Sequence, residues 1–188
     1  LRRLGHSKIN VGHAGTIDPL ATGILIVCLG RATKQAEALQ AQPKEYLTTL
    51  ALGATTPSFD MEHPVDRTFP YEHITRQMLE EALRTMEGEQ MQLPPVYSAK
   101  SIDGKRAYEY ARQGTEVEMR RAPVTVYGMR LESFEPPRAT LRIRCSKGTY
   151  IRSIARDLGE KLGSGAYLTA LCRTRSGDFT LEDAYTLP

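Results

Sequence analysis

Apolar and polar residues alternate along several stretches of the chain with the period of two that is typical of β-strands. The clearest example is Leu-Arg-Ile-Arg-Cys at residues 141–145, where a strand would bury one face and present Arg142 and Arg144 on the other. Before it, residues 23–29, which contain an unbroken apolar run from 24 to 29, predict a buried strand. Strands are predicted at residues 23–29, 46–52, 124–134 and 139–145. The last two are expected to pair in antiparallel fashion across Glu-Pro-Pro at residues 135–137.

Helical spacing of apolar residues marks a second group of segments. Residues 150–162 place Ile151, Ile154, Ala155, Leu158 and Leu162 on one face, while Arg152 and Arg156 lie on another. Residues 75–87 form an amphipathic pattern, with Thr75 as N-cap and Gly88 after the end. The residues expected to point inward are Met78, Leu79, Leu83 and Met86. Shorter helices are predicted at residues 32–41, before Pro43, and at 106–112.

The order of these elements predicts an α+β (mixed α/β) domain. Most predicted strands are not separated by crossover helices, so a mostly antiparallel mixed sheet is favoured over a doubly wound parallel sheet. Residues 53–70 and 93–96 are rich in proline and are expected to be loop and extended chain. A length of 188 residues suits one domain covering residues 1–188.

Composition narrows the class of protein. Hydrophobic residues make up 40% and charged residues 25%, as in ordinary soluble domains. The longest apolar run, residues 24–29, is far shorter than the roughly 20 residues that cross a bilayer. The three cysteines are scattered and form no Cys-x-x-Cys pair, which argues against a zinc site or a disulfide framework. We expect a cytoplasmic enzyme or binding protein without a metal.

The net charge of +3 is distributed unevenly. Residues 1–34 carry +4, residues 35–135 carry −5, residues 136–177 carry +7 and the last eleven carry −3. A local excess of positive charge indicates a polyanionic partner or, alternatively, an ordinary solvated face. Because the strand at 141–145 and the helix at 150–162 both carry arginines at regular spacing, the polyanion interpretation is favoured.

The most suggestive chemical segment is Gly-His-Ala-Gly-Thr-Ile-Asp-Pro at residues 12–19. An aspartate before proline is biased toward an extended backbone, and two glycines permit a ligand to approach closely. Taken alone, Asp18 would be assigned to an Asx-type turn leading into a strand. A phosphate-binding P-loop is disfavoured because the Lys-Ser/Thr pair is missing.

Three further segments follow in order. They are Lys-Glu-Tyr at 44–46 with Leu-Gly at 52–53, Lys-Gly-Thr-Tyr-Ile-Arg at 147–152 running on to Asp-Leu-Gly at 157–159, and Leu-Cys-Arg at 171–173. Together with the segment at 12–23, they resemble the motifs of the TruB family of tRNA pseudouridine synthases, with Ile17 replacing leucine and Cys172 replacing the middle arginine of Leu-Arg-Arg. The insertion at about 94–121, which opens Pro-Pro-Val-Tyr-Ser-Ala-Lys, resembles the family's RNA-gripping thumb. The likeness spans nearly the whole chain and implies the pseudouridine synthase fold.

The resemblance implies three catalytic residues. Asp18 is the nucleophile toward the uridine, at C6 of the base or C1′ of the ribose; the sequence leaves both open. Arg152 pairs with Asp18, and Tyr46 stacks on the uracil near the proton that leaves C5. A guanidinium suits the first pairing because burial disfavours an ionised carboxylate and a neighbouring permanent cation offsets that effect.

The resemblance also implies a set of substrate-binding residues. Leu171 and Tyr150 line the pocket, His13 fills or props the gap left by the flipped nucleotide, and Lys147 and Arg173 belong to the basic segment that contacts RNA. Flipping the target base out of the folded RNA costs a few kcal/mol, and aromatic stacking and phosphate contacts would offset this cost. The ordinary alternatives are strand and helix-start tyrosines, a surface arginine at 152, a loop histidine and a core leucine.

For the substrate, the resemblance implies the uridine at conventional position 55 in the T arm of tRNA, isomerised without a cofactor by a monomer. Two alternatives stay open: an RNA-guided relative that works inside a ribonucleoprotein, and a non-catalytic RNA-binding or tRNA-folding module. The stand-alone enzyme is favoured by Leu-Ala-Thr-Gly at residues 20–23. The family's upstream strand with a Lys-Pro pair and its C-terminal PUA-type domain have no counterpart between Leu1 and Pro188, so a fragment is expected.

Overall fold

A curved β-sheet forms the centre of the protein. The computed structural model describes residues 9–98, 101–102, 105–107, 110 and 118–186. The sheet has the strand order β13-β12-β4-β11-β10-β7, and β2 pairs with β12 off this path. Its strands are β2 (Thr22–Gly23), β4 (Lys44–Leu52), β7 (Gly88–Gln92), β10 (Ala122–Glu135), β11 (Arg138–Cys145), β12 (Ala166–Ser176) and β13 (Phe179–Thr180). All pairings are antiparallel except β2 with β12, so the predicted mixed, mostly antiparallel sheet is confirmed.

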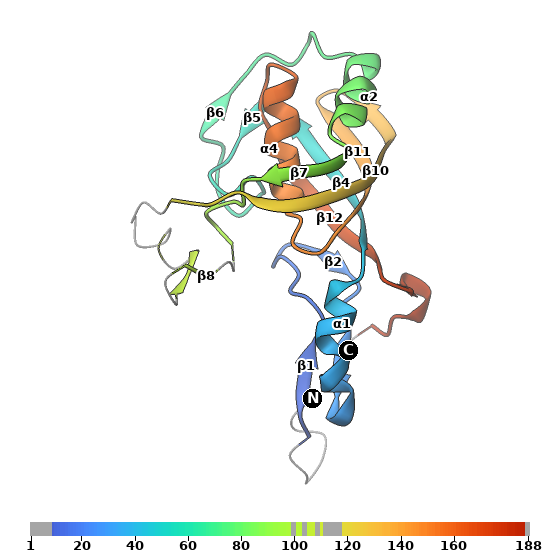
Figure 1. Cartoon of the computed structure of the whole chain (residues 1–188). Helices are drawn as coiled ribbons and strands as arrows, with labels where there is room; N and C mark the ends of the chain where they lie inside the picture. Colours follow the sequence, from blue (N-terminus) through green and yellow to red (C-terminus); the bar gives the residue numbers. More distant parts are fainter. Residues whose placement is uncertain (1–8, 99–100, 103–104, 108–109, 111–117, 187–188) are drawn as a thin grey trace.

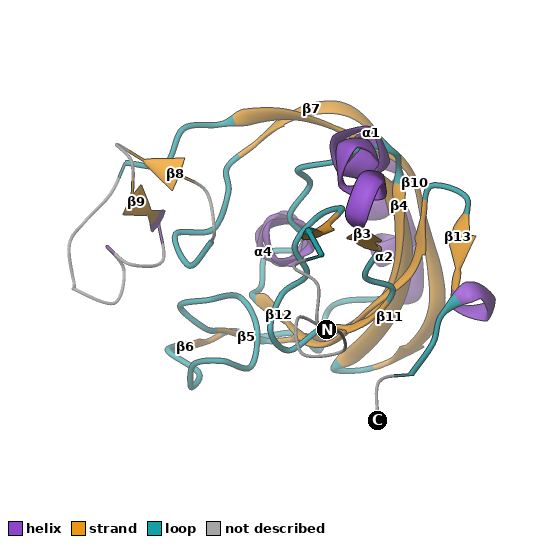
Figure 2. Cartoon of the chain, turned by 90° about the horizontal axis from the view of Figure 1, so that it is seen from below, coloured by secondary structure: helices purple, strands orange, loops and turns teal. Residues whose placement is uncertain are grey.

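Two helices cover the concave side of this sheet. Figure 2 shows the sheet curving around α4 (Ile151–Lys161), and α2 (Arg76–Thr85) lies against β10. Alternation along β11 places Leu141 and Ile143 in the core, where they are fully buried beside Ile154 of α4. The hydrophobic core therefore lies between one sheet face and these two helices.

Smaller elements surround this core. Near the amino end, β1 (Val11–His13) pairs with β3 (Val27–Leu29), followed by the 3-10 helix η1 (Gly30–Gln35) and α1 (Ala36–Ala41); Figure 1 shows β1 and α1 below the sheet. Two antiparallel pairs have strands of only two residues each: β5 (Ala54–Thr55) pairs with β6 (Arg67–Thr68), and β8 (Ser101–Ile102) pairs with β9 (Lys105–Arg106). A 3-10 turn, η2 (Leu181–Asp183), follows β13. No helix of the described part of the chain is long and apolar enough to cross a membrane.

The strongly periodic predictions are confirmed. Strands β10 and β11 form the expected long antiparallel pair across the proline turn, and α4 begins after Tyr150. Helix α2 has the predicted cap, in which the Thr75 hydroxyl accepts a hydrogen bond from the Met78 amide at 3.2 Å. The Met78 side chain itself was expected to point inward but is 39% exposed, because it lies in the first turn, past the edge of the apolar face.

The strand prediction for residues 23–29 was wrong. The apolar run at 23–29 is not one buried strand: it divides into β2, which pairs with β12, and β3, which pairs with β1, and only Ile24 and Cys28 are buried within it. The division has a local cause, since Gly23 adopts a left-handed conformation with φ 98°. The helix expected at 32–41 is present: it begins two residues earlier as the 3-10 helix η1 and continues as α1 to Ala41. Of the helix expected at 106–112, the described residues Ala107 and Tyr110 are helical and Arg106 belongs to β9; the other residues lie outside the described part of the chain. Strands β7 and β12 were not predicted.

Candidate active site

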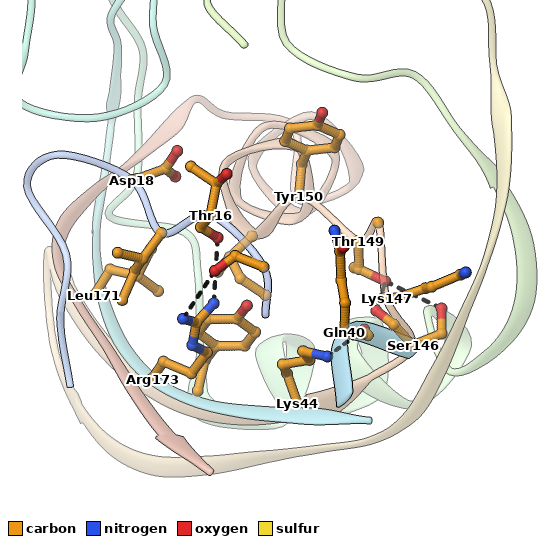
Figure 3. Close-up of a pocket in the computed structure, with 15 residues that line it drawn as sticks. Thr16, Asp18, Gln40, Lys44, Ser146, Lys147, Thr149, Tyr150, Leu171 and Arg173 are labelled. Atoms are coloured by element: carbon orange, nitrogen blue, oxygen red, sulfur yellow. Dashed lines mark hydrogen bonds between the residues drawn. The ribbon is translucent and has the colours of Figure 1, made fainter. Parts of the chain in front are cut away.

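A loop between β1 and β2 carries Asp18 at the edge of the sheet. Gly15 gives this loop its turn with φ 96°, and the Ala21 amide donates to the Asp18 carbonyl at 2.9 Å. Behind the loop lies Arg173 of β12, which is only 1% exposed. Its guanidinium donates to the backbone carbonyl oxygens of Thr16 at 3.2 Å and Gly15 at 3.4 Å (Figure 3). It also donates to the carbonyl oxygen of Ile24 at 2.7 Å. The shape of the loop is therefore fixed by a buried arginine.

The carboxylate of Asp18 is held by a second arginine, from the first turn of α4. Arg152 Nε donates to Asp18 Oδ2 at 3.0 Å and Nη2 donates to Oδ1 at 2.8 Å, which is a bidentate pair. The Arg152 side chain is 5% exposed and that of Asp18 is 29% exposed. The remaining nitrogen, Nη1, donates to the carbonyl oxygens of Tyr97 at 2.8 Å and Ser58 at 3.3 Å. Asp18 is thus paired but still reachable from solvent.

A second carboxylate, Asp60, lies beside the same guanidinium, with 3.6 Å between its Oδ2 and Arg152 Nε. Its other oxygen accepts from the Ser58 hydroxyl at 2.6 Å and the Glu62 amide at 2.9 Å, and its carbonyl accepts from Thr56. Sequence reasoning missed Asp60, since it stands in an irregular loop with no periodic pattern. Arg152 therefore neutralises one buried carboxylate and one accessible carboxylate.

A cavity of about 310 Å³ opens next to Asp18. Its lining includes Tyr46 of β4, Leu171 of β12 and the turn between β11 and α4, which contributes Lys147 and Tyr150 (Figure 3). A smaller cavity of about 150 Å³ lies on the other side and shares Asp18 and Leu171 with the first. The predicted residues Asp18, Tyr46, Lys147, Tyr150, Leu171 and Arg173 are thus brought around one cavity, with Arg152 behind Asp18.

The cavity is electropositive apart from Asp18. Its lining residues include three cations, Lys44, Lys147 and Arg173, against that one acid. Burial and the nearby Arg173 lower the pKa of Lys44, whose ammonium donates to carbonyl oxygens at the end of α1, including Gln42 at 2.6 Å. Burial raises the pKa of Tyr46 above its ordinary value, an effect that the charge of Arg173 partly offsets. Tyr46 is therefore a neutral phenol over the physiological range of pH.

His13 is placed differently from the other predicted residues. It lies exposed in β1, opposite Val27 of β3, and lines neither of the two cavities around Asp18. Within the described residues, no hydrogen bond or ring contact joins the His13 side chain to the other predicted site residues.

The basic segment at residues 136–177 does not form one face. Arg142 and Arg144 lie on the sheet face opposite the core and cavity, since Ile143 and its partner Tyr46 point the other way. Arg142 donates to Glu45 at 2.9 Å and to Glu132 at 2.7 Å, so its charge is used within the sheet. The arginines of the strand therefore do not share a surface with the cavity.

In chemical terms the site offers one accessible carboxylate held by a permanent cation, an aromatic ring beside it and surrounding positive charge. No group of three His, Cys, Asp or Glu residues that could hold a metal ion occurs in the part of the chain that the structure describes.

Comparison with known proteins identifies the family. Residues 2–151 match the profile of "TruB family pseudouridylate synthase (N terminal domain)", and residues 152–188 match "tRNA pseudouridylate synthase B C-terminal domain". The chain belongs to the TruB family. As a TruB-family pseudouridine synthase it is an isomerase, and its mixed sheet has the fold of that class.

Curated relatives of this TruB-family chain include tRNA pseudouridine synthase B of Phocaeicola vulgatus, 54% identical over 99% of the chain and 79% of the relative. The Bacteroides thetaiotaomicron protein of the same name is 55% identical over 97% of the chain and 78% of the relative. Among solved structures, a chain of a Cbf5-Nop10-Gar1 complex superposes with a TM-score of 0.68 at 29% identity over 91% of this chain. The protein spans only 41% of that solved chain.

Proposed function

We propose that the protein converts the uridine at position 55, in the T arm of tRNA, to pseudouridine, with Asp18 as nucleophile. The observation that carries the proposal is the bidentate Arg152–Asp18 pair at the edge of a positively charged cavity. The relatives named tRNA pseudouridine synthase B support tRNA as the substrate. The proposed reaction is an isomerisation, so its atoms and electrons balance without a redox carrier or an energy source.

The chain's own residues would divide the reaction as follows. A carboxylate oxygen of Asp18 attacks the uridine, and the bond between N1 of the base and C1′ of the ribose breaks. The base turns and C5 bonds to C1′. The bond to Asp18 breaks, which regenerates the free carboxylate, while C5 loses its proton and N1 gains one. Tyr46 in its neutral form stacks on the uracil, while Tyr150 and Leu171 enclose it.

Binding of the RNA would rest on the cations nearest the cavity. Lys147 is exposed at its rim and is the direct candidate for a phosphate contact. Arg173 has its donors directed at loop carbonyls, and we assign it mainly to holding the loop. We retain the insertion at about 94–121 as an RNA contact and His13 as a prop for the flipped position, in a single catalytic unit that acts as a monomer.

The RNA-guided alternative is favoured by one observation, that a chain of a Cbf5-Nop10-Gar1 complex superposes on this protein. The identity to that chain is 29%, against 54% to the tRNA enzymes, so the stand-alone reaction is preferred.

The test uses unmodified tRNA transcript, with no guide RNA, and maps pseudouridine after incubation with the protein. The wild type should give product at position 55, and Asp18→Asn should give none while still binding the transcript. Asp178→Asn, a neutral change at an exposed aspartate, serves as the matched control and should be fully active. Equal product from Asp18→Asn and wild type would refute the nucleophile assignment, and product only with added guide RNA would favour the alternative.

A further inference from the structure

One wall of the cavity is a single turn. Residues 146–151, between β11 and α4, contribute six of the fifteen lining residues, among them Lys147 and Tyr150. The first end of this turn is fixed to β10, since the Ser146 amide donates to the Thr125 carbonyl at 2.8 Å and the Thr125 amide donates to the Ser146 hydroxyl at 2.9 Å. The position of the wall then depends on what holds its other end, at Tyr150.

The other end is held by the side chain of Gln92, the last residue of β7. Its Oε1 accepts a hydrogen bond from the Tyr150 amide at 2.8 Å, and its Nε2 donates to the Tyr150 carbonyl at 3.1 Å. Both ends of the amide thus bind the backbone of one residue. Gln92 is 2% exposed, although the rest of β7 is largely exposed.

A glutamine is the side chain that this arrangement needs. Tyr150 precedes the first turn of α4, so its amide has no partner inside the helix. Its carbonyl accepts from the Ile154 amide inside the helix and, in addition, from Gln92 Nε2. Only a side-chain amide supplies one donor and one acceptor in this geometry, whereas glutamate cannot donate when ionised and methionine of similar size does neither. Simple packing would favour an apolar residue at so buried a position.

The backbone that Gln92 holds leads directly to two residues of the proposed active site. The ring of Tyr150 lines the cavity (Figure 3), and two residues later Arg152 pairs with Asp18. We propose that Gln92 is a positioning residue for pseudouridine formation: it sets the place of the Tyr150 ring against the base without touching the substrate. This inference rests on the proposed function and adds a residue to it.

A double-mutant cycle tests the inference. Single-turnover rates and tRNA affinities are measured for wild type, Gln92→Met, Tyr150→Ala and the combined variant. Gln92→Met should slow the reaction about 10- to 100-fold, because a small misplacement of a positioning group costs about this much. Its tRNA affinity should change by less than about threefold, and in the Tyr150→Ala background it should slow the rate by less than about threefold, since the ring it positions is gone. Gln90→Met is the matched control on the same strand, because Gln90 donates to Met86 and lines neither cavity.

Three outcomes would overturn the inference: an unchanged rate for Gln92→Met, the same fold-loss in both backgrounds, or a loss of affinity as large as the loss of rate. Should Gln92→Met fail to fold, Gln92→Glu keeps the shape and the acceptor but removes the donor, and is carried through the same cycle. The failures are separable. No product from wild type would refute the proposed function, whereas an active wild type with an equally active Gln92→Met refutes only the role of Gln92.

Discussion

Replacing Arg152 with lysine tests how the Asp18 carboxylate is held. The guanidinium makes two hydrogen bonds to Asp18, at 3.0 and 2.8 Å, and Nη1 donates to the carbonyls of Tyr97 and Ser58. An ammonium has three donors that diverge from one atom, so it cannot span both carboxylate oxygens and also reach the two carbonyls. Arg152→Lys therefore keeps a cationic side chain beside Asp18 but removes the bidentate pairing with its carboxylate.

The size of the effect follows from the bonds lost. A hydrogen bond to a charged group contributes about 1.5–3 kcal/mol. If one of the two bonds to Asp18 is needed in the transition state, its loss lowers the rate about 10- to 150-fold, at 1.36 kcal/mol for each factor of ten. An unpartnered buried carbonyl should also lower the free energy of unfolding, by about 1–3 kcal/mol.

The assay is single-turnover formation of pseudouridine in tRNA, followed by release of tritium from C5-labelled uridine, with affinity measured by filter binding. Arg152→Lys should lose rate and keep its tRNA affinity. Arg76→Lys is the control, since Arg76 makes only an exposed surface pair with Glu80 and its replacement should be neutral. A rate equal to wild type, or a loss confined to affinity, would show that the bidentate pair has no part in turnover.

Further predictions concern the groups around this pair. Asp60→Asn should slow turnover by about tenfold without weakening tRNA binding, because Arg152 loses its second carboxylate; an unchanged single-turnover rate would contradict this. Gly23→Ala should destabilise the fold by more than about 3 kcal/mol in urea unfolding, because φ is 98° and a Cβ would lie 2.2 Å from a backbone oxygen of β12, whereas Gly128→Ala, with open space around it, should be near neutral. Burial raises the pKa of Cys145 from 9.0 to about 11, so the unfolded chain releases this proton first. The Cys145 thiol therefore leaves the free energy of unfolding unchanged below pH 9 and should lower it by about 1.4 kcal/mol per pH unit between pH 9 and 11. In alkaline urea titrations, Cys145→Ala should lack this decrease.

Where the sequence pattern was regular, it predicted the fold. The alternation at residues 139–145 and the helical spacing at 150–162 reappear as β11 and α4 because one face of each packs on the core. Strand β12 was missed for physical reasons. Register shifts between Leu168 and Ala170 and between Arg173 and Arg175 break the period of two, and the buried Arg173 stands where the pattern expects an apolar residue. Strand β7 is a polar edge strand that exists because β10 pairs with it.

The candidate site was predictable only in part. Asp18 and Arg152 are 134 residues apart, and no periodicity links them; a family resemblance did. Asp60 and Gln92 carry no pattern of their own, since their roles depend on which backbone groups lie next to them after folding. Charge counted along the chain could not show that Arg142 pairs with Glu45 and Glu132 on the far face of the sheet, since those pairings also depend on the folded register.

The use of arginine on both sides of the Asp18 loop has a physical cause within the same cavity. Arg173 holds the backbone of the loop and Arg152 holds its carboxylate, and these residues are 1% and 4% exposed. Lys44 shows what happens to a lysine nearby, since burial and the charge of Arg173 lower its pKa. A guanidinium keeps its proton at such depth and aims its donors in fixed directions, so it can satisfy separate carbonyls or both oxygens of one carboxylate. Loss of activity in Arg152→Lys should therefore follow from the loss of these directed donors.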